Sequence, residues 1–151
     1  MPKLNIICDT REKPTHRFLF KDYDVNVEIA KIDVGDYKEK EIDNVCIEKK
    51  ESIEELFRNL TNKDDKIRFN KELLKMNNFD YSYLILCFDL HDVLKGTKYS
   101  KISPNYVISM LTEIQIKYGI YVYFAGKDAE YLVYRILKKH KDLEKGNNKW
   151  L

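Results

Sequence analysis

Residues 81–88 read YSYLILCF, an almost unbroken apolar run with the length of one β-strand. A strand with one face in water alternates apolar and polar side chains, whereas a continuous apolar run is typical of a strand covered on both faces. Residues 120–124, IYVYF, form a second run of this kind. We therefore expect a sheet with helices packed against both of its sides.

Shorter patterns complete the fold prediction. Strand-like apolar runs lie at residues 4–8, 25–30 and 44–48. Apolar side chains repeat at helical spacing in residues 53–60, 107–118 and 129–137. Ser52 and Glu55 form a capping box before the first of these helices. This order predicts an α/β fold, a mixed central sheet flanked by helices, in one domain over residues 1–144 with a flexible tail over 145–151.

Composition limits the class of protein. The chain has 151 residues, of which 44% are hydrophobic and 34% charged, as in an ordered globular domain. No apolar run approaches the roughly 20 residues of a membrane span, and the first residues do not resemble a signal peptide. Cys8, Cys46 and Cys87 each lie within an apolar run, which predicts reduced core residues of an intracellular protein. We therefore expect no membrane association and a cytoplasmic or nucleoid-associated location.

Several common catalytic sites are absent from the sequence. The five glycines form neither a dinucleotide-binding fingerprint nor a P-loop, and no serine lies in a GxSxG motif. His16, His91 and His140 are scattered, and none has a histidine or cysteine partner at zinc-binding spacing. We interpret all three histidines as surface or loop residues.

A group of acidic residues with one lysine remains. Because side chains alternate along a strand, Glu48 and Lys50 share one face while Lys49 points to the other. The polar stretch before this strand is short enough for a hairpin, which would bring Asp36 beside Glu48. Asp9 ends the first predicted strand, and strand ends at one edge of a sheet commonly cluster. The sequence therefore predicts two or three carboxylates and one ammonium in a single site.

Such a site suits the hydrolysis of a phosphodiester. Crowded carboxylates repel one another, and a hard divalent cation, Mg²⁺ or Mn²⁺, relieves that repulsion. Asp36 and Glu48 would bind the metal with help from Asp9, and Lys50 would orient water or neutralise the transition state. In a chain that is one-third charged, the same pattern also arises as a hairpin with ordinary surface ion pairs. The residues alone leave both interpretations open.

The surrounding motifs resemble a known family. The chain reads CDTRE at residues 8–12, VGDY at 34–37 and IEKK at 47–50, with Glu54 following. In this order the motifs resemble the nuclease domain of the XPF family of structure-specific endonucleases. Further similarity over residues 4–140 lies at 68–73, 83–86, 103–105, 115–119 and the stripe from 129. The resemblance implies a restriction-endonuclease-like fold.

Some positions depart from the family pattern. Lys49 replaces the arginine of the family motif ERK, and its backbone carbonyl would still reach the metal. Glu54 replaces the last signature aspartate, although a favourable charge at a helix N-terminus explains it equally well. Glu72 replaces a usual glutamine. Arg11 and Glu12 match the family, where they support the site; for Arg11, a phosphate contact and a structural ion pair are equal alternatives.

The resemblance also implies contacts with DNA and with a second chain. The candidates for phosphate contacts are Lys63, Lys66, Arg68 and Lys71, together with the basic helix 135–149. Exposed tyrosines could stack on unpaired bases, although half-buried strand positions explain most of them. Because family nuclease domains associate through their last helices, helix 105–118 and the 129–137 stripe are candidates for a homodimer interface. Ordinary core packing is the alternative for these residues.

The sequence thus favours a Mg²⁺- or Mn²⁺-dependent DNA endonuclease that acts near branches or junctions, as the resemblance implies. The alternative is a non-catalytic subunit that keeps the fold and binds only DNA or another nuclease chain. The presence of Asp36, Glu48 and Lys50 together speaks against that alternative, because a scaffold has no physical need to crowd carboxylates around a lysine.

Overall fold

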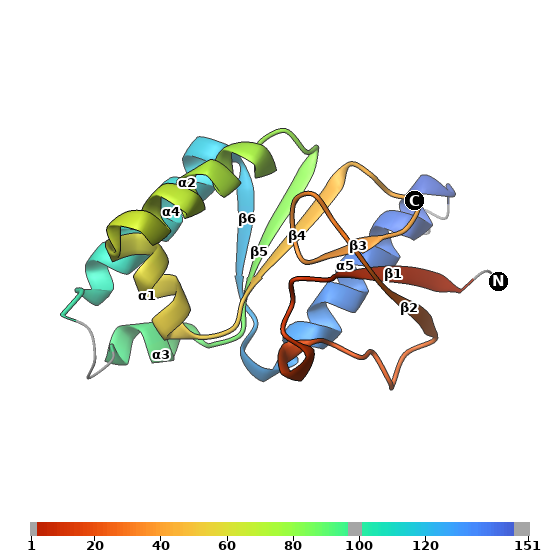
Figure 1. The fold of residues 1–151 in the computed structure, drawn as a ribbon, viewed down its shortest axis with the longest axis horizontal. Helices are drawn as coiled ribbons and strands as arrows, with labels where there is room; N and C mark the ends of the chain where they lie inside the picture. The colour runs from red at the N-terminus through yellow and green to blue at the C-terminus, as the bar shows by residue number, and fades with distance from the viewer. Residues whose placement is uncertain (1–2, 97–100, 147–151) are drawn as a thin grey trace.

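A computed structural model describes residues 3–96 and 101–146. Six strands form one sheet in the order β2-β1-β3-β4-β5-β6 (Figure 1). The strands are β1 (Leu4–Asp9), β2 (Val25–Ala30), β3 (Tyr37–Glu39), β4 (Val45–Lys50), β5 (Tyr81–Leu86) and β6 (Ile120–Phe124). The helices are α1 (Ile53–Thr61), α2 (Lys63–Met76), α3 (Leu90–Lys95), α4 (Pro104–Tyr118) and α5 (Ala129–Glu144), with 3₁₀ turns at η1 (Pro14–His16) and η2 (Gly126–Asp128). Most of the predicted tail, residues 147–151, lies outside the described residues.

The sheet is mixed, as predicted. β1 and β2 pair in parallel, and so do β4 with β5 and β5 with β6. β3 is the short strand between the two parallel groups and pairs antiparallel with both β1 and β4. The predicted hairpin between the segment around residue 37 and the β4 strand is therefore present, with Tyr37 opposite Ile47.

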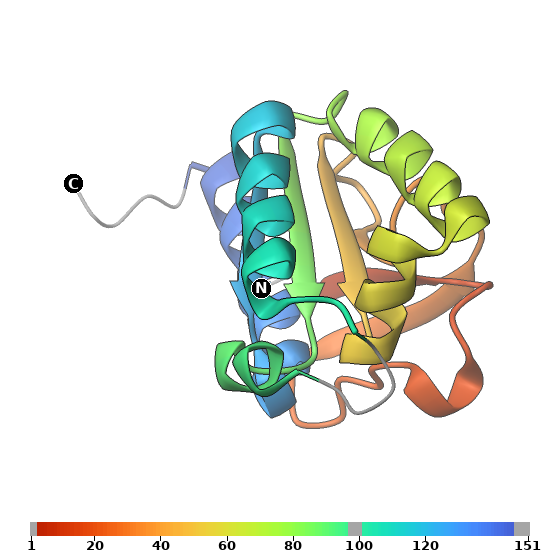
Figure 2. The same cartoon turned by 90° about the vertical axis from the view of Figure 1, so that its left-hand side faces the viewer.

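Helices cover both sides of this sheet. Figures 1 and 2 show α1, α2 and α4 on one face and α5 on the other. β5 is buried from both directions: Leu84 and Leu86 pack in the cluster under α1, α2 and α4, whereas Ile85 packs in the cluster under α5. The run at residues 81–88 is thus apolar because helices cover this strand on both faces, as predicted from the sequence. Among the described residues, no helix has both the length and the apolarity that crossing a membrane requires.

Three details differ from the sequence predictions. The run at residues 120–124 predicts a strand covered on both faces, yet Tyr121 of β6 is 48% exposed and Tyr123 is 40% exposed. Ser52 accepts a hydrogen bond from the Glu55 N–H, but the Glu55 carboxylate accepts from the Glu51 N–H, so the capping box is only half formed. β2 alternates in sequence, yet its side chains are all exposed or partly exposed because this strand lies at the edge of the sheet.

The apolar stripe of α5 lies in the core. Ala129, Val133 and Leu137 are buried against β-strand residues, so the core-packing alternative holds for these three positions. The α4 residues Val107, Leu111 and Ile114 are likewise buried. Ile116 of α4, in contrast, does not pack in the core and is 80% exposed.

Gly35 lets the segment that precedes β3 lie close against β4. Its φ angle is +95°, in the left-handed region that side-chain-bearing residues rarely adopt. A Cβ at this position would lie 2.9 Å from the Cys46 Sγ and 2.9 Å from the Ile47 carbonyl oxygen. Only glycine fits this close approach without displacement of β4.

Gly35→Ala should therefore destabilise the protein by at least about 3 kcal/mol, because backbone strain and a backbone clash act together. The matched control is Gly119→Ala at the end of α4, where φ is +65° and a Cβ would meet nothing within 4 Å. That variant should cost only about 1 kcal/mol. Urea unfolding of the two variants measures the difference, and equal losses would contradict the assigned role of Gly35.

Candidate active site

The pairing of β3 with β4 brings Asp36 to the middle of the sheet. The Asp36 N–H donates to the Ile47 carbonyl at 2.7 Å, and the Asp36 carbonyl accepts from the Asp9 N–H at 2.9 Å. The carboxylate accepts from the Lys49 N–H at 2.8 Å. Asp36 is thus tied by backbone hydrogen bonds to the strands on both sides of it.

β4 presents Glu48 and Lys50 on the face toward α2. The Lys50 Nζ lies 3.7 Å from Glu48 Oε1 and 3.8 Å from Glu55 Oε1. The same ammonium lies 4.8 Å from the centre of the Phe69 ring. Burial alone would lower the pKa of Lys50, but the nearby carboxylates, above all Glu48, outweigh burial and raise it. Lys50 therefore stays positively charged within the site.

The carboxylates of the site are crowded. Burial raises the pKa of Asp36 to about 7, against the opposing hydrogen bond from the Lys49 N–H. Burial likewise raises the pKa of Glu48 well above its usual range, and the negative charges of Asp36 and Glu72 add to that rise. The charge of Lys50 lowers the pKa of Glu48 but does not outweigh burial and the neighbouring acids. A retained proton or a bound cation would relieve the repulsion between Asp36 and Glu48.

Asp9 lies at the same cleft, but its oxygens already have protein partners. Oδ1 accepts from the Ile32 N–H at 2.8 Å, and Oδ2 accepts from Arg11 Nε at 2.7 Å. Burial opposes ionisation of Asp9, yet these hydrogen bonds outweigh it and lower its pKa. Arg11 also donates from its guanidinium to the Ile32 carbonyl at 2.6 Å. Arg11 thus forms an ion pair with Asp9, while its side chain remains 64% exposed at the cleft, so the phosphate contact stays a prediction.

Lys49 lies on the opposite face of β4 and organises a second group of charges. Its Nζ is 2.9 Å from Glu12 Oε2 and 3.0 Å from Glu51 Oε2, and it donates to the His16 carbonyl at 2.6 Å. The ammonium also lies 4.4 Å from the centre of the Phe18 ring. Burial would lower the pKa of Lys49, but the hydrogen bonds to the two glutamates raise it. Glu12 thus pairs with this buried lysine, and its supporting role in the site stays a prediction.

Two adjoining hollows open at these residues. One, of about 450 Å³, is lined by Asp9, Arg11, Asp33, Val34, Gly35, Asp36, Glu48, Arg68, Lys71, Glu72 and Lys75. The other, of about 330 Å³, is lined by Arg11, Glu12, Lys13, His16, Asp36, Glu48, Lys49, Glu51, Glu55 and Arg58. Both include Arg11, Asp36 and Glu48. Most of the predicted site residues therefore border one continuous region, with Lys50 buried beside it.

Three predicted residues lie elsewhere. Glu54 is exposed on α1 and lines neither hollow, whereas its neighbour Glu55 does. Lys63 and Lys66 also line neither hollow. Sequence reasoning missed Lys75, which extends the basic face of Arg68 and Lys71; their helical spacing was the available signal.

The described residues supply only part of the ligand set of a metal ion. In residues 3–96 and 101–146, no group of three or more His, Cys, Asp or Glu side chains could hold a metal ion by itself. Asp36 and Glu48 nevertheless offer hard oxygen ligands, and burial raises the pKa of both. This donor set fits Mg²⁺, which commonly uses one or two carboxylates and keeps several waters.

The ERCC4 domain family matches residues 8–133 of this chain. The chain therefore belongs to the ERCC4 domain family. Comparison with curated protein sequences found no match.

Two solved structures share the fold. The first is XPF from Aeropyrum pernix, with a TM-score of 0.72 and 14% sequence identity, over 97% of this chain and 69% of that chain. The second is XPF from Aeropyrum pernix in complex with DNA, with a TM-score of 0.66 and 15% identity, over 94% of this chain and 66% of that chain. The chain thus spans about two thirds of the length of these proteins. The similarity confirms the predicted α/β fold.

Asp36→Asn should stabilise the metal-free protein in a pH-dependent way. Because the folded pKa, about 7, exceeds the ordinary value of 3.8, the folded state binds more protons between these values. The stability of the wild-type protein therefore falls as pH rises from about 4 to about 7. Asparagine keeps an acceptor for the Lys49 N–H but cannot ionise.

Urea unfolding in EDTA at several pH values measures this effect. The advantage of Asp36→Asn should be smallest at pH 4 and should grow by up to about 4 kcal/mol at pH 8. An advantage that is the same at every pH would contradict a raised pKa at this position.

Proposed function

We propose that this protein is a divalent-metal-dependent endonuclease that hydrolyses phosphodiester bonds in DNA. The observation that carries the proposal is the crowding of Asp36 and Glu48 beside the charged Lys50, in a cleft with basic residues on α2. Membership of the ERCC4 domain family supports it. A structurally similar protein, XPF from Aeropyrum pernix, has been solved in complex with DNA, which supports DNA as the substrate.

Asp36 and Glu48 would hold Mg²⁺ or Mn²⁺, with Asp9 and the Lys49 backbone carbonyl as further oxygen donors. The bound metal would polarise the phosphoryl group and lower the pKa of a water molecule. Asp9 also holds the loop that precedes the site, through its bonds to Ile32 and Arg11. The buried ion pairs of Lys49 fix the rest of β4 in place.

Lys50 would act on the reacting phosphate. Its ammonium stays protonated, so it serves as a fixed positive charge near the charge that develops on the phosphoryl oxygens. Water would attack phosphorus in line, and the bond to the 3′ oxygen would break. The products would carry a 5′-phosphate and a 3′-hydroxyl group, with the protons of the water divided between them.

The substrate would bind mainly through its phosphates. Arg68, Lys71 and Lys75 line the cleft from α2 and place positive charge next to the carboxylates. Contacts of this kind give affinity without sequence preference, which suits recognition of DNA shape. We propose that branched or junction DNA is the preferred substrate and that the protein acts inside the cell, where that DNA lies.

Two further candidate properties concern protein partners. The first is a homodimer through the C-terminal helices, on which Ile116 of α4 and Leu143 of α5 are among the exposed apolar side chains. The second is the non-catalytic subunit, which would bind DNA without metal. Calorimetric titration with Mn²⁺ separates that subunit from an enzyme, since a scaffold should show no binding near millimolar metal.

Lys50→Ala should reduce cleavage at least about 100-fold, because the positive charge facing the phosphate is lost. The assay compares flap, fork and linear DNA, each with Mg²⁺ and with EDTA. The wild-type protein should cut only with Mg²⁺, and the branched substrates best. Lys117→Ala, which removes an exposed lysine from α4, is the matched control and should keep wild-type activity. Cleavage by Lys50→Ala at the wild-type rate would exclude this mechanism.

Arg68→Ser with Lys71→Ser should lower the salt dependence of DNA binding. Each lost phosphate contact reduces the slope of log K against log salt by about 0.9 for duplex DNA, so the double variant should lose about 1.8. Lys63→Ser, on the same helix but outside the cleft, should leave the slope unchanged. Fluorescence anisotropy in EDTA measures binding without cleavage. A larger effect of Lys63→Ser would move the binding surface away from the cleft.

A further inference from the structure

The smaller of the two hollows at the candidate active site extends away from α2, and we call it the η1 hollow. It begins at Asp36 and Glu48, which also line the larger hollow, and continues past η1 to Arg58 in the last turn of α1. Its volume of about 330 Å³ lies near the lower end of the roughly 300–1,000 Å³ of small-molecule sites. The η1 hollow therefore has room for about one nucleotide unit of a strand.

Two cationic side chains line the η1 hollow without a carboxylate partner. Lys13 directly precedes η1, Arg58 lies on α1, and both residues are exposed. In the part of the chain that the structure describes, neither side chain forms an ion pair with an acidic residue. Both charges are thus available to an anionic ligand, and the phosphates of a nucleic-acid strand are ligands of this kind.

The glutamates of the η1 hollow have other cationic partners. The ammonium groups of Lys49 and Lys50, which are both buried, lie within ion-pair distance of the four glutamates that line the hollow: Glu12, Glu51, Glu48 and Glu55. A metal ion fits the η1 hollow less well than an anion, because these glutamates are already paired and Lys13 and Arg58 would repel it.

The wall that carries Lys13 is held against β4 and β3. The Lys49 Nζ donates to the His16 carbonyl at 2.6 Å, which ties the end of η1 to β4. Two residues further on, the Phe18 N–H donates to the Tyr37 hydroxyl at 2.9 Å, and the two rings stack with their centroids 5.2 Å apart. A wall that is fixed in this way needs little reordering when a ligand binds.

We propose that the η1 hollow binds the phosphate next to the scissile phosphate, on the side away from α2, through Lys13 and Arg58. The inference rests on the proposed function, because it takes Asp36 and Glu48 as the place of cleavage. These two residues line both hollows, so a strand that fills the η1 hollow is continuous with one that lies along α2.

A strand in this position contacts the protein on both sides of the cut. Arg68 and Lys71 of α2 would hold the phosphates on one side, and the η1 hollow would hold the phosphate on the other. Contacts of this kind fix the register of the strand over the metal ligands. The substrate must then have nucleotides on both sides of the scissile bond, which is the requirement of an endonuclease.

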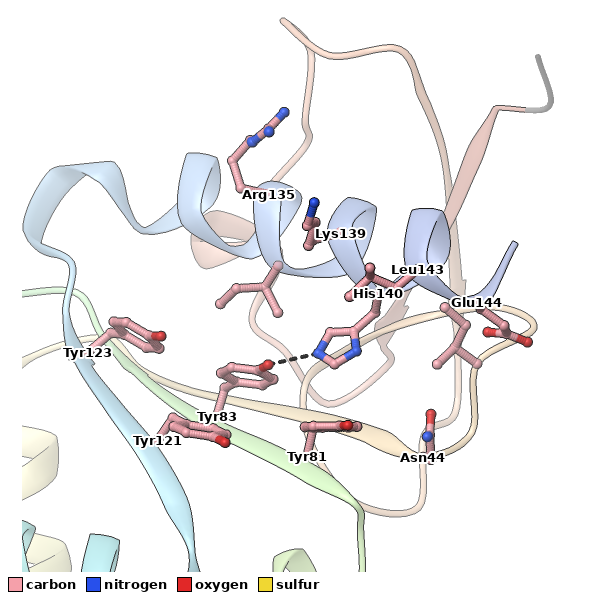
Figure 3. Close-up of a pocket in the computed structure, with 12 residues that line it drawn as sticks. Asn44, Tyr81, Tyr83, Tyr121, Tyr123, Arg135, Lys139, His140, Leu143 and Glu144 are labelled. Atoms are coloured by element: carbon pink, nitrogen blue, oxygen red, sulfur yellow. Dashed lines mark hydrogen bonds between the residues drawn. The ribbon is translucent and has the colours of Figure 1, made fainter. Parts of the chain in front are cut away.

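A larger groove, the aromatic groove, takes no part in this strand path (Figure 3). Its volume is about 960 Å³, and Tyr83, Tyr121 and Tyr123 line it together with residues of α5. The Tyr83 hydroxyl and His140 Nε2 form a hydrogen bond of 2.7 Å. His140 is thus partly buried, and its interpretation as a surface or loop residue was wrong. The sheet separates this groove from Glu48, and α5 is a helix of the candidate homodimer contact.

The first test measures binding of a fluorescein-labelled fork DNA in EDTA by fluorescence anisotropy. Lys13→Ser with Arg58→Ser should reduce the slope of log K against log salt by about 1.8 where the strand in the hollow is paired and by about 1.4 where it is unpaired. Lys13→Arg with Arg58→Lys keeps both charges and should leave the slope unchanged. Lys21→Ser with Lys117→Ser removes two exposed lysines that line neither hollow, and should leave it unchanged too.

Cleavage kinetics with Mg²⁺ locate the contact relative to the scissile phosphate. A contact with a neighbouring phosphate is the same in the ground state and the transition state. The Lys13 and Arg58 serine pair should therefore raise KM about 10-fold and keep kcat within about threefold of wild type. A fall in kcat as large as that expected for Lys50→Ala would overturn the proposal, because the two cations would then act on the reacting phosphate.

A wild-type salt slope for the serine pair would also overturn the proposal. Arg58→Gln alone should reduce the slope by half as much as the pair, and it decides the question if the double variant does not fold.

The outcome is separable from that of the proposed function. If the serine pair lowers the salt slope but the wild-type chain cuts no DNA with Mg²⁺, the η1 hollow binds a strand phosphate and the enzyme assignment fails. If the wild-type chain cuts branched DNA while the serine pair keeps the wild-type slope and KM, the enzyme assignment stands and the assignment of the η1 hollow fails.

Discussion

The site depends on how closely the segment before β3 approaches β4. Gly35 permits this approach because it has no Cβ. A Cβ at this position would clash with the Cys46 Sγ and the Ile47 carbonyl oxygen. The hydrogen bond from the Asp36 N–H to the Ile47 carbonyl then fixes the register. Asp36 consequently lies beside Glu48, and the charges of the site follow from that position.

The electrostatics of the cleft follow from the same constraint. Two carboxylates on neighbouring segments are held in a poorly solvated place, so burial raises the pKa of each. Lys50 supplies one positive charge, and its contact with Phe69 keeps the ammonium on that side of β4. The Lys49 ammonium has its own glutamates on the other face, so its charge is balanced there. A bound cation would therefore stabilise the folded state.

Much of this arrangement could be predicted from the sequence. A run that is apolar on both faces identifies the central strand, and alternation places Glu48 and Lys50 together and Lys49 apart. The distinction between Glu54 and Glu55 could not be predicted, because adjacent helical residues point about 100° apart and the phase of α1 depends on its packing. For Arg11, spacing allowed two partners, and only the folded loop brings its guanidinium to Asp9 and the Ile32 carbonyl.

The aromatic groove was beyond sequence reasoning for a related reason. Its lining comes from β5, β6 and α5, which are far apart in the chain, and it exists because α5 packs over the strands before β6. Tyrosines at alternate strand positions predict half-buried residues, but they do not predict whether the space above the rings is filled or open. The three-dimensional path of α5 decides that.

A crystal structure of the protein soaked in Mn²⁺, with anomalous scattering data, tests the central claim most directly. The account predicts an anomalous peak between the carboxylates of Asp36 and Glu48, about 2 Å from an oxygen of each. A well-soaked crystal with no peak there, or with the metal bound only elsewhere, would contradict it.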